Sequence, residues 1–312
     1  MADKIATRAA YGEILPQLGK EYPDLVVMDA DLSGSTKTAE FRKVFPERFF
    51  NMGIAEQNLY GQAAGLALSG KIVCASTFAM FATGRAFEII RNAIGYTGAN
   101  VKICATHSGI TVGEDGASHQ TFEDIALMRT IPGMTVVNPS DAVAAKKLIR
   151  QAVEKDGPFY VRLGRAAVPV FYGEEDDIVL SKGNLVRDGS DVTIVATGIM
   201  VSSAWEAAQT LAEEGIDARI IDIHTIKPID EEILVKAAKE TGRIVTAEEH
   251  SVIGGLGDAA AHVLVRRCPV PMAMVGQQDI FGESGKPNQL LEKYGMTAAD
   301  IVCAVKKLMP AK

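Results

Sequence analysis

Short apolar runs alternate with stretches of helical periodicity along this chain, and that alternation constrains the fold more than any other feature. Helix-like segments separate most of the runs. Because strands joined through helices run parallel and are buried on both faces, the pattern predicts an α/β protein with parallel sheets covered by helices. The expected strands lie at residues 25–28, 72–75, 101–105, 135–137, 159–163, 192–197, 218–221, 243–247 and 272–275.

One segment interrupts the alternation and divides the chain. Residues 168–190 are rich in acidic residues and glycine and lack clear helical periodicity, which is typical of a linker. We therefore expect two domains, each a mainly parallel sheet flanked by helices. Their expected ranges are 1–167 and 188–312, with 168–187 as the linker.

Charge and composition narrow the classes of partner. The formal net charge is −7 and the basic residues are scattered, so neither nucleic acid nor an anionic membrane is expected as the main partner. There is no run of about 18 apolar residues that could cross a membrane, and no apolar core of a signal peptide near the N-terminus. Four widely spaced cysteines without a CxxC motif indicate reduced thiols rather than a zinc site, and hence a cytoplasmic protein.

The segment FFNMGIAEQNLYGQAAGLALSG, residues 49–70, places Glu56 at the start of a helix rich in small residues. An isolated acid in a first turn usually only complements the helix dipole. The next expected strand, however, is followed by Phe78 and Phe81 at the edge where α/β sheets bind ligands. Two phenylalanines alone would indicate core packing, but next to the first segment they favour a functional role for Glu56.

A second group of polar residues follows the strand expected at 101–105. In THSGITVGEDGASHQ, residues 106–120, His107, Asp115 and His119 lie within 13 residues in a glycine-rich loop. Such a loop at a strand end is a candidate site, and histidine suits acid–base work because it titrates near neutral pH. A metal site is the rival interpretation, which the lack of a third clear ligand disfavours.

These two segments resemble the pyrimidine-binding domain of thiamine diphosphate enzymes, and specifically of transketolases. The resemblance continues through DIHTIKPID (222–230) and EEHSVIGGLGDAA (248–260), which are similar to the transketolase C-terminal domain. It implies that Glu56 hydrogen-bonds N1′ of the aminopyrimidine of the cofactor. It also implies that Phe81, with Phe78 beside it, stacks on that ring, and that Asp31, in a D-L-x-x-S pattern, lies near the thiazolium.

The same resemblance implies roles on the substrate side. In transketolases the two loop histidines contact substrate hydroxyls and act as acid–base groups, which assigns these roles to His107 and His119. The loop aspartate, here Asp115, reads the hydroxyl at C2 of an aldose acceptor.

Phosphate binding is expected from arginines, because they offer planar, bidentate donors. In YVRLGRAAVP, Arg165 matches the phosphate-binding arginine of the family, whereas Arg162 should point elsewhere by strand alternation. Arg8 and Ser35 match the remaining phosphate contacts. For Arg8, a solvated helix charge is an equally good interpretation.

The resemblance covers only the last two of the three domains of a full transketolase. The G-D-G…N pattern that holds Mg²⁺ and the diphosphate in the family does not occur in this sequence. The resemblance therefore implies a separate N-terminal transketolase subunit that carries Mg²⁺ and the diphosphate end of thiamine diphosphate, with no metal ligand on this chain. Because the sites of the family form at subunit interfaces, an α2β2 assembly is expected.

The activity implied by the resemblance is the transfer of a two-carbon ketol unit from a ketose phosphate to an aldose phosphate. One alternative is the β chain of another thiamine diphosphate enzyme, of the 2-oxoacid dehydrogenase or deoxyxylulose phosphate synthase type. The GEDGASHQ loop and the LGR at 163–165 fit transketolase better. A non-catalytic regulatory relative is a further alternative, which the joint presence of the loop histidines, Asp115 and Glu56 argues against.

Overall fold

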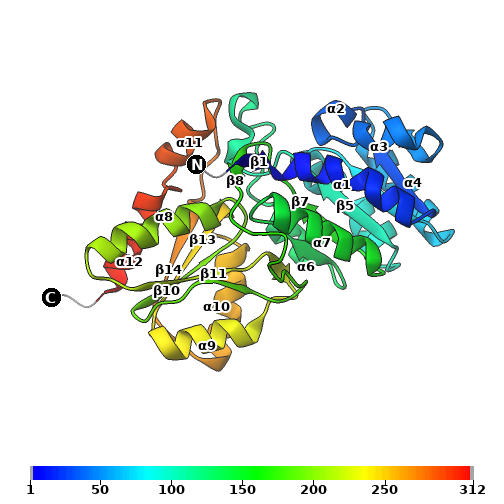
Figure 1. Cartoon of the computed structure of the whole chain (residues 1–312). Coiled ribbons are helices and arrows are strands. Elements are labelled where there is room, and N and C mark those ends of the chain that lie inside the picture. Colours follow the sequence, from blue (N-terminus) through cyan, green and yellow to red (C-terminus); the bar gives the residue numbers. More distant parts are fainter. Residues whose placement is uncertain (1–2, 310–312) are drawn as a thin grey trace.

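The computed structural model describes residues 3–309 and shows two α/β units side by side (Figure 1). Every neighbouring strand pair in the two large sheets is parallel except β12 with β6 and β9 with β11, each at a sheet edge. The predicted fold class, two mainly parallel sheets flanked by helices, is confirmed.

The first sheet has the order β12 (Thr225–Lys227), β6 (Thr135–Val137), β7 (Phe159–Arg162), β5 (Val101–Ala105), β4 (Ile72–Ser76), β2 (Leu25–Asp29) and β3 (Phe49–Asn51). The second has the order β14 (Met272–Gln277), β13 (Ile244–Ser251), β10 (Val192–Ala196), β11 (Ala218–Asp222) and β9 (Asn184–Arg187).

Helices cover both faces of each sheet. One face of the first sheet packs against α1 (Thr7–Glu21), α3 (Ala39–Val44) and α7 (Ala142–Glu154). The other packs against α4 (Glu56–Leu68), η3 (Ile90–Gly95) and α6 (Asp124–Thr130). On the second sheet, α8 (Met200–Glu213), α11 (Pro287–Lys293) and α12 (Ala298–Leu308) cover one face. The opposite face is covered by α9 (Glu231–Thr241) and α10 (Leu256–Arg267).

The central strands show why the apolar runs predicted this arrangement. All five residues of β2 are buried. Val26 and Met28 belong to the core under α4, whereas Leu25 and Val27 belong to the core under α1. Because the strand is buried on both faces, apolar side chains occupy successive positions from Leu25 to Met28, which explains the continuous run.

Several short elements differ from the prediction. The sequence pattern predicts an amphipathic helix over about residues 4–20, but residues 4–6 form β1 (Lys4–Ala6), which pairs antiparallel with β8 (Ala167–Pro169). The sequence pattern also predicts one helix over about residues 79–94, but the structure divides this segment into π-helical η2 (Phe81–Arg85), α5 (Phe87–Ile89) and η3. The polar loop after β2 contains α2 (Ser33–Thr36), and a 3₁₀ turn, η1 (Pro46–Arg48), precedes β3.

The segment between the two units is held by two buried aspartates. Asp141 Oδ2 accepts hydrogen bonds from the backbone N–H groups of Phe171 and Tyr172, both at 2.9 Å. The Tyr172 hydroxyl donates to Asp222 Oδ2 at 3.0 Å, and Ser140 Oγ donates to the same oxygen at 2.6 Å. The domain ranges stay a prediction, with β9 lying inside the expected linker and residues 1–2 and 310–312 outside the described part.

The burial of Asp222 makes stability depend on pH. Burial raises the pKa of this carboxyl to about 7, so the folded state favours its protonated form more than the unfolded state does. Its contribution to stability is therefore complete below the unfolded pKa, near ~3.9, and is lost as the pH rises through 7.

We predict that Asp222→Asn gains stability relative to the wild type as the pH rises, because the amide carries no charge to desolvate. Urea unfolding should show the difference in unfolding free energy shifting in favour of the variant by roughly 3 kcal/mol between about pH 4.5 and 8.5. Asp177→Asn, at an exposed position, should show no such shift. Parallel pH profiles for Asp222→Asn and the wild type would contradict the prediction.

Candidate active site

The predicted site residues follow five adjacent strands of the first sheet. The strands β7, β5, β4, β2 and β3 are neighbours in this order and all parallel, so their carboxyl ends share one edge of the sheet. This edge is where open α/β sheets bind ligands. Arg165 follows β7, and His107, Asp115 and His119 follow β5. Phe78 and Phe81 follow β4, Asp31 and Ser35 follow β2, and Glu56 follows β3.

Arg8 joins this edge although it follows no strand of the large sheet. The β1–β8 pairing places the start of α1 beside the end of β7, where Gly164 N–H donates to Thr7 Oγ1 at 2.8 Å. Arg8 Nη1 then donates to the carbonyl oxygen of Ser35 at 2.8 Å. Burial and the positive charge of Arg165 lower the pKa of Arg8. Within residues 3–309 Arg8 forms no ion pair, so its charge is available to an anion.

The protonation state of His107 follows from its two neighbours. Arg8 Nη1 lies 3.4 Å from His107 Nε2, and arginine can only donate, so Nε2 must carry a lone pair. The ring proton is then on Nδ1 and points to Thr106 Oγ1 at 2.8 Å. Burial and the charges of Arg8 and Arg165 lower the pKa of His107 to about 3. His107 is therefore a neutral imidazole near neutral pH, with the lone pair of Nε2 turned toward Arg8.

The backbone conformation of His107 supports a functional role for this residue. Its φ is 58°, in the left-handed region that residues other than glycine seldom adopt. Thr106 N–H donates to the Thr77 carbonyl at 3.1 Å, and Ala79 N–H donates to the Thr106 carbonyl at 2.7 Å. Strain held in place by the surrounding structure is common at active sites.

Aromatic rings form a continuous layer beside His107. The Phe78 ring stacks on the His107 ring with centroids 3.8 Å apart, and the Phe81 ring lies 6.0 Å from that of Phe78. His119 presents its edge to Phe81 at 5.4 Å, and its Nδ1 lies 3.0 Å from Ser118 Oγ. The structure thus brings the two predicted phenylalanines and the two predicted histidines together.

Glu56 lies at the other end of this layer and is 2% exposed. Arg85 Nη1 donates to its Oε2 at 2.8 Å, and the Arg85 guanidinium lies 4.7 Å from the centre of the Phe81 ring. A buried carboxyl next to an aromatic face fits an aminopyrimidine, which offers a flat ring and ring nitrogens. Sequence reasoning missed Arg85, although its place about one turn after Phe81 in the same segment could have indicated it.

Asp115 and Asp31 lie at the rim of the site. Arg165 Nη1 donates to the Val112 carbonyl and lies 3.5 Å from a carboxylate oxygen of Glu114 and 3.9 Å from one of Asp115. Asp115 itself is exposed. These contacts place the predicted phosphate-binding arginine next to the predicted hydroxyl-reading aspartate.

The exposed Asp31 is held by Asn51, which donates from Nδ2 to Asp31 Oδ1 at 2.9 Å and accepts from the Asp31 N–H at 3.0 Å. Arg162 points away from the site, as strand alternation predicted. It is buried against Asp124, with Nε 2.7 Å from Asp124 Oδ2.

Across residues 3–309, no three His, Cys, Asp or Glu side chains gather as a metal-binding group. No helix in the same range has the length and apolar character needed to cross a bilayer.

Comparison with protein families matches both units. The transketolase pyrimidine binding domain matches residues 3–170, and the transketolase C-terminal domain matches residues 181–301. The chain belongs to the transketolase family. The predicted identification as the C-terminal half of a transketolase is confirmed by these two matches. Transketolases depend on thiamine diphosphate.

Similar proteins match the transketolase chain over nearly its whole length. A Methanocaldococcus jannaschii protein whose name marks it as a transketolase C-terminal section is 52% identical, covering 97% of this chain and 96% of its own length. A 6-deoxy-6-sulfo-D-fructose transketolase subunit of Clostridium sp. (strain MSTE9) is 42% identical, covering 98% and 95%. A solved structure described as a split gene transketolase, inactive beta4 tetramer, has a TM-score of 0.92 at 57% identity, covering 97% of this chain and 98% of that one.

We predict that His107 of this transketolase chain stays neutral from pH 5 to 8, because burial and two arginines oppose its charge. Its ring carbon resonance, assigned by its loss in His107→Gln, should not titrate in that range by NMR. In Arg8→Gln the pKa of His107 should rise, since one of the opposing charges is removed. A wild-type midpoint near the ordinary ~6.5 would contradict the prediction.

Proposed function

We propose that this chain supplies the pyrimidine and sugar-phosphate side of a transketolase site that a second polypeptide completes. The observation that carries the proposal is the arrangement along one sheet edge. A buried Glu56 carboxyl, an aromatic layer, the neutral His107 and Arg165 follow one another over adjacent strands, and Arg8 reaches the same edge from α1. A carboxyl and an aromatic face suit the pyrimidine, and the arginines suit a phosphate.

On the cofactor side, Glu56 would hold the ring nitrogen of the aminopyrimidine and Phe81 its face, with Phe78 beside it. When bound, thiamine diphosphate supplies the carbon nucleophile that the cleavage of a carbon–carbon bond requires. We expect the diphosphate and Mg²⁺ to be held by the N-terminal subunit, since this sequence lacks the G-D-G…N pattern. Asp31 stays a prediction for the thiazolium side.

On the substrate side, this chain would bind a ketose phosphate and move its protons. Arg165 and Arg8, with Ser35, would anchor the phosphate, because the two guanidiniums are close enough for the charge of one to lower the pKa of the other. His107 would take the proton of the C3 hydroxyl at Nε2, which is the lone-pair nitrogen facing Arg8. Because the imidazole is already neutral, it needs no prior deprotonation.

Two further groups would act on the sugar hydroxyls. His119, at the edge of the Phe81 ring, would exchange protons with a second hydroxyl. Asp115 would read the C2 hydroxyl of the aldose acceptor from the rim, next to Arg165. The proposed reaction is thus the transfer of a two-carbon ketol unit from a ketose phosphate to an aldose phosphate.

A sulfonated ketose is a second candidate donor. The Clostridium relative is named for 6-deoxy-6-sulfo-D-fructose and is 42% identical. Because a sulfonate is also a tetrahedral oxyanion, Arg8 and Arg165 could bind it in place of a phosphate. Comparing the two donors in one assay would separate these candidates.

We further propose that the active form is an α2β2 assembly in the cytoplasm. The similar split-gene structure is a tetramer of this kind of chain and is described as inactive, which agrees with a site that needs another subunit. Cys74, Cys104, Cys268 and Cys303 are free thiols, which supports the proposal of a reducing compartment.

The proposal is tested by ketol transfer from xylulose 5-phosphate to ribose 5-phosphate with thiamine diphosphate and Mg²⁺. This chain is assayed alone and after co-expression with a candidate N-terminal subunit. Activity only in the mixture is the expected result. Activity of this chain alone would contradict the divided site. No transfer from either a phosphorylated or a sulfonated donor by a mixture that binds the cofactor would favour the non-catalytic alternative.

We predict that Glu56→Ala lowers kcat of the assembled enzyme by at least about 10³-fold, because it removes the buried carboxyl proposed to hold the pyrimidine nitrogen and electrostatic groups of this kind contribute on that scale. Glu56→Gln should fall similarly, since an amide cannot exchange the proton. Glu40→Ala, which removes an acid from the first turn of α3, is the matched control and should keep full activity. Near-normal turnover in Glu56→Ala would refute the role of Glu56.

A further inference from the structure

Each glycine between His107 and His119 lies against the second unit. A Cβ at Gly109 would collide with the Glu249 carboxyl, and one at Gly116 would collide with Ser284. At Gly113 it would lie 3.3 Å from Pro287, the first residue of α11. All three glycines have positive φ, so the loop needs glycine both for its backbone and for the close approach of the second unit.

The loop is also tied to the second unit at both ends by hydrogen bonds. Thr111 N–H donates to Glu249 Oε1 at 2.7 Å, four residues after His107 and at the start of η4 (Ile110–Asp115). Gln120 Nε2 donates to the Glu283 carbonyl at 2.9 Å, one residue after His119. Glu249 is 2% exposed, so its bond to Thr111 is shielded from water.

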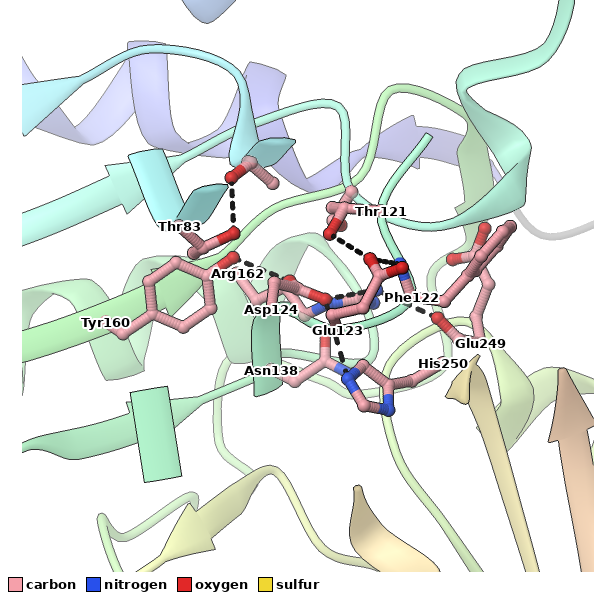
Figure 2. Close-up of polar contacts among 12 residues, drawn as sticks. Thr83, Thr121, Phe122, Glu123, Asp124, Asn138, Tyr160, Arg162, Glu249 and His250 are labelled. Atoms are coloured by element: carbon pink, nitrogen blue, oxygen red, sulfur yellow. Dashed lines mark hydrogen bonds and ion pairs between the residues drawn. The ribbon is translucent and has the colours of Figure 1, made fainter. Parts of the chain in front are cut away.

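A buried network fixes Glu249 in turn (Figure 2). Arg162 on β7 donates from Nη2 to the Glu249 carbonyl at 2.8 Å and from Nε to Asp124 Oδ2 at 2.7 Å. The Tyr160 hydroxyl donates to the same Asp124 oxygen at 2.6 Å. Figure 2 shows Tyr160 and Arg162 converging on Asp124, with His250 approaching from the β13 side. The strand that carries Glu249 is therefore locked to the sheet that carries the site.

We propose that Glu249 is a positioning residue for the active site. By accepting from Thr111 N–H and filling the space beside Gly109, it holds the loop in the shape that directs His107 and His119 toward the substrate. The second unit would thereby shape the site that the first unit carries. The expected effect on activity rests on the proposed function, whereas the expected effect on the conformation of the loop does not.

Glu248 provides a matched control for a merely structural role. It precedes Glu249 on β13 and is fully buried, and it also accepts from backbone N–H groups. Glu248 accepts hydrogen bonds from the N–H groups of Leu256, at 2.6 Å, and Gly257, at 2.8 Å. Both donors lie in the second unit, at the start of α10. Loss of Glu248 should therefore disturb the second unit without releasing the loop.

The first test compares variants in the assembled enzyme. Glu249→Ala should lower kcat at least about tenfold with a much smaller change in KM, because a small displacement of catalytic groups affects the transition state most. Glu249→Gln should restore most of kcat, since its amide oxygen can still accept from Thr111 N–H. Glu248→Ala should keep kcat within about threefold. Equal losses of kcat in Glu249→Ala and Glu248→Ala would overturn the inference.

The second test uses this chain without a partner and needs no activity. Hydrogen exchange over residues 107–120 should accelerate in Glu249→Ala at least about tenfold, because the Thr111 amide loses its acceptor. The same segment should exchange at the wild-type rate in Glu248→Ala. If Glu249→Ala does not fold, Glu249→Asp, which keeps the charge but is one methylene shorter, takes its place. An unchanged exchange rate in the folded Glu249 variant would overturn the inference even if the wild-type mixture showed no activity.

Discussion

The parallel pairing of β7, β5, β4, β2 and β3 is the constraint on which the rest of the structure depends. Because the strands run in one direction, all five carboxyl ends meet at one edge, and residues far apart in sequence become neighbours there. Because the strands are apolar along successive positions, they are buried on both faces. The side chains of β2, for example, alternate between the core under α4 and the core under α1. The same burial that stabilises the sheet therefore also assembles the candidate site.

Two further interactions complete that edge from outside the sheet. The antiparallel β1–β8 pair moves Arg8 next to the end of β7, where it faces Ser35 and His107. The second unit contacts the loop after β5, where Glu249 accepts a hydrogen bond from the Thr111 N–H. The low pKa of His107 depends on these contacts, because the two arginines that keep the imidazole neutral come from different segments, Arg8 from α1 and Arg165 from the loop after β7.

The sequence was sufficient for the fold class and for the residues that follow strands directly. The helix that begins at Glu56 and the strands at Val101–Ala105 and Thr135–Val137 match the prediction, because long helical periodicity and apolar runs are local signals. The short strands β1, β8, β9 and β12 were not predicted, since their partners lie far away in the chain. The position of Glu249 was equally out of reach, because 138 residues separate it from Thr111.

The division of one cofactor site between two polypeptides is tested most directly by the binding of thiamine diphosphate. Calorimetric titration with thiamine diphosphate and Mg²⁺ would be carried out on this chain, on the N-terminal subunit and on the two together. Tight binding by the mixture, weakened by Glu56→Ala, with at most weak binding by either chain alone, is the predicted result. Binding by this chain alone with the affinity of the mixture would contradict the divided site.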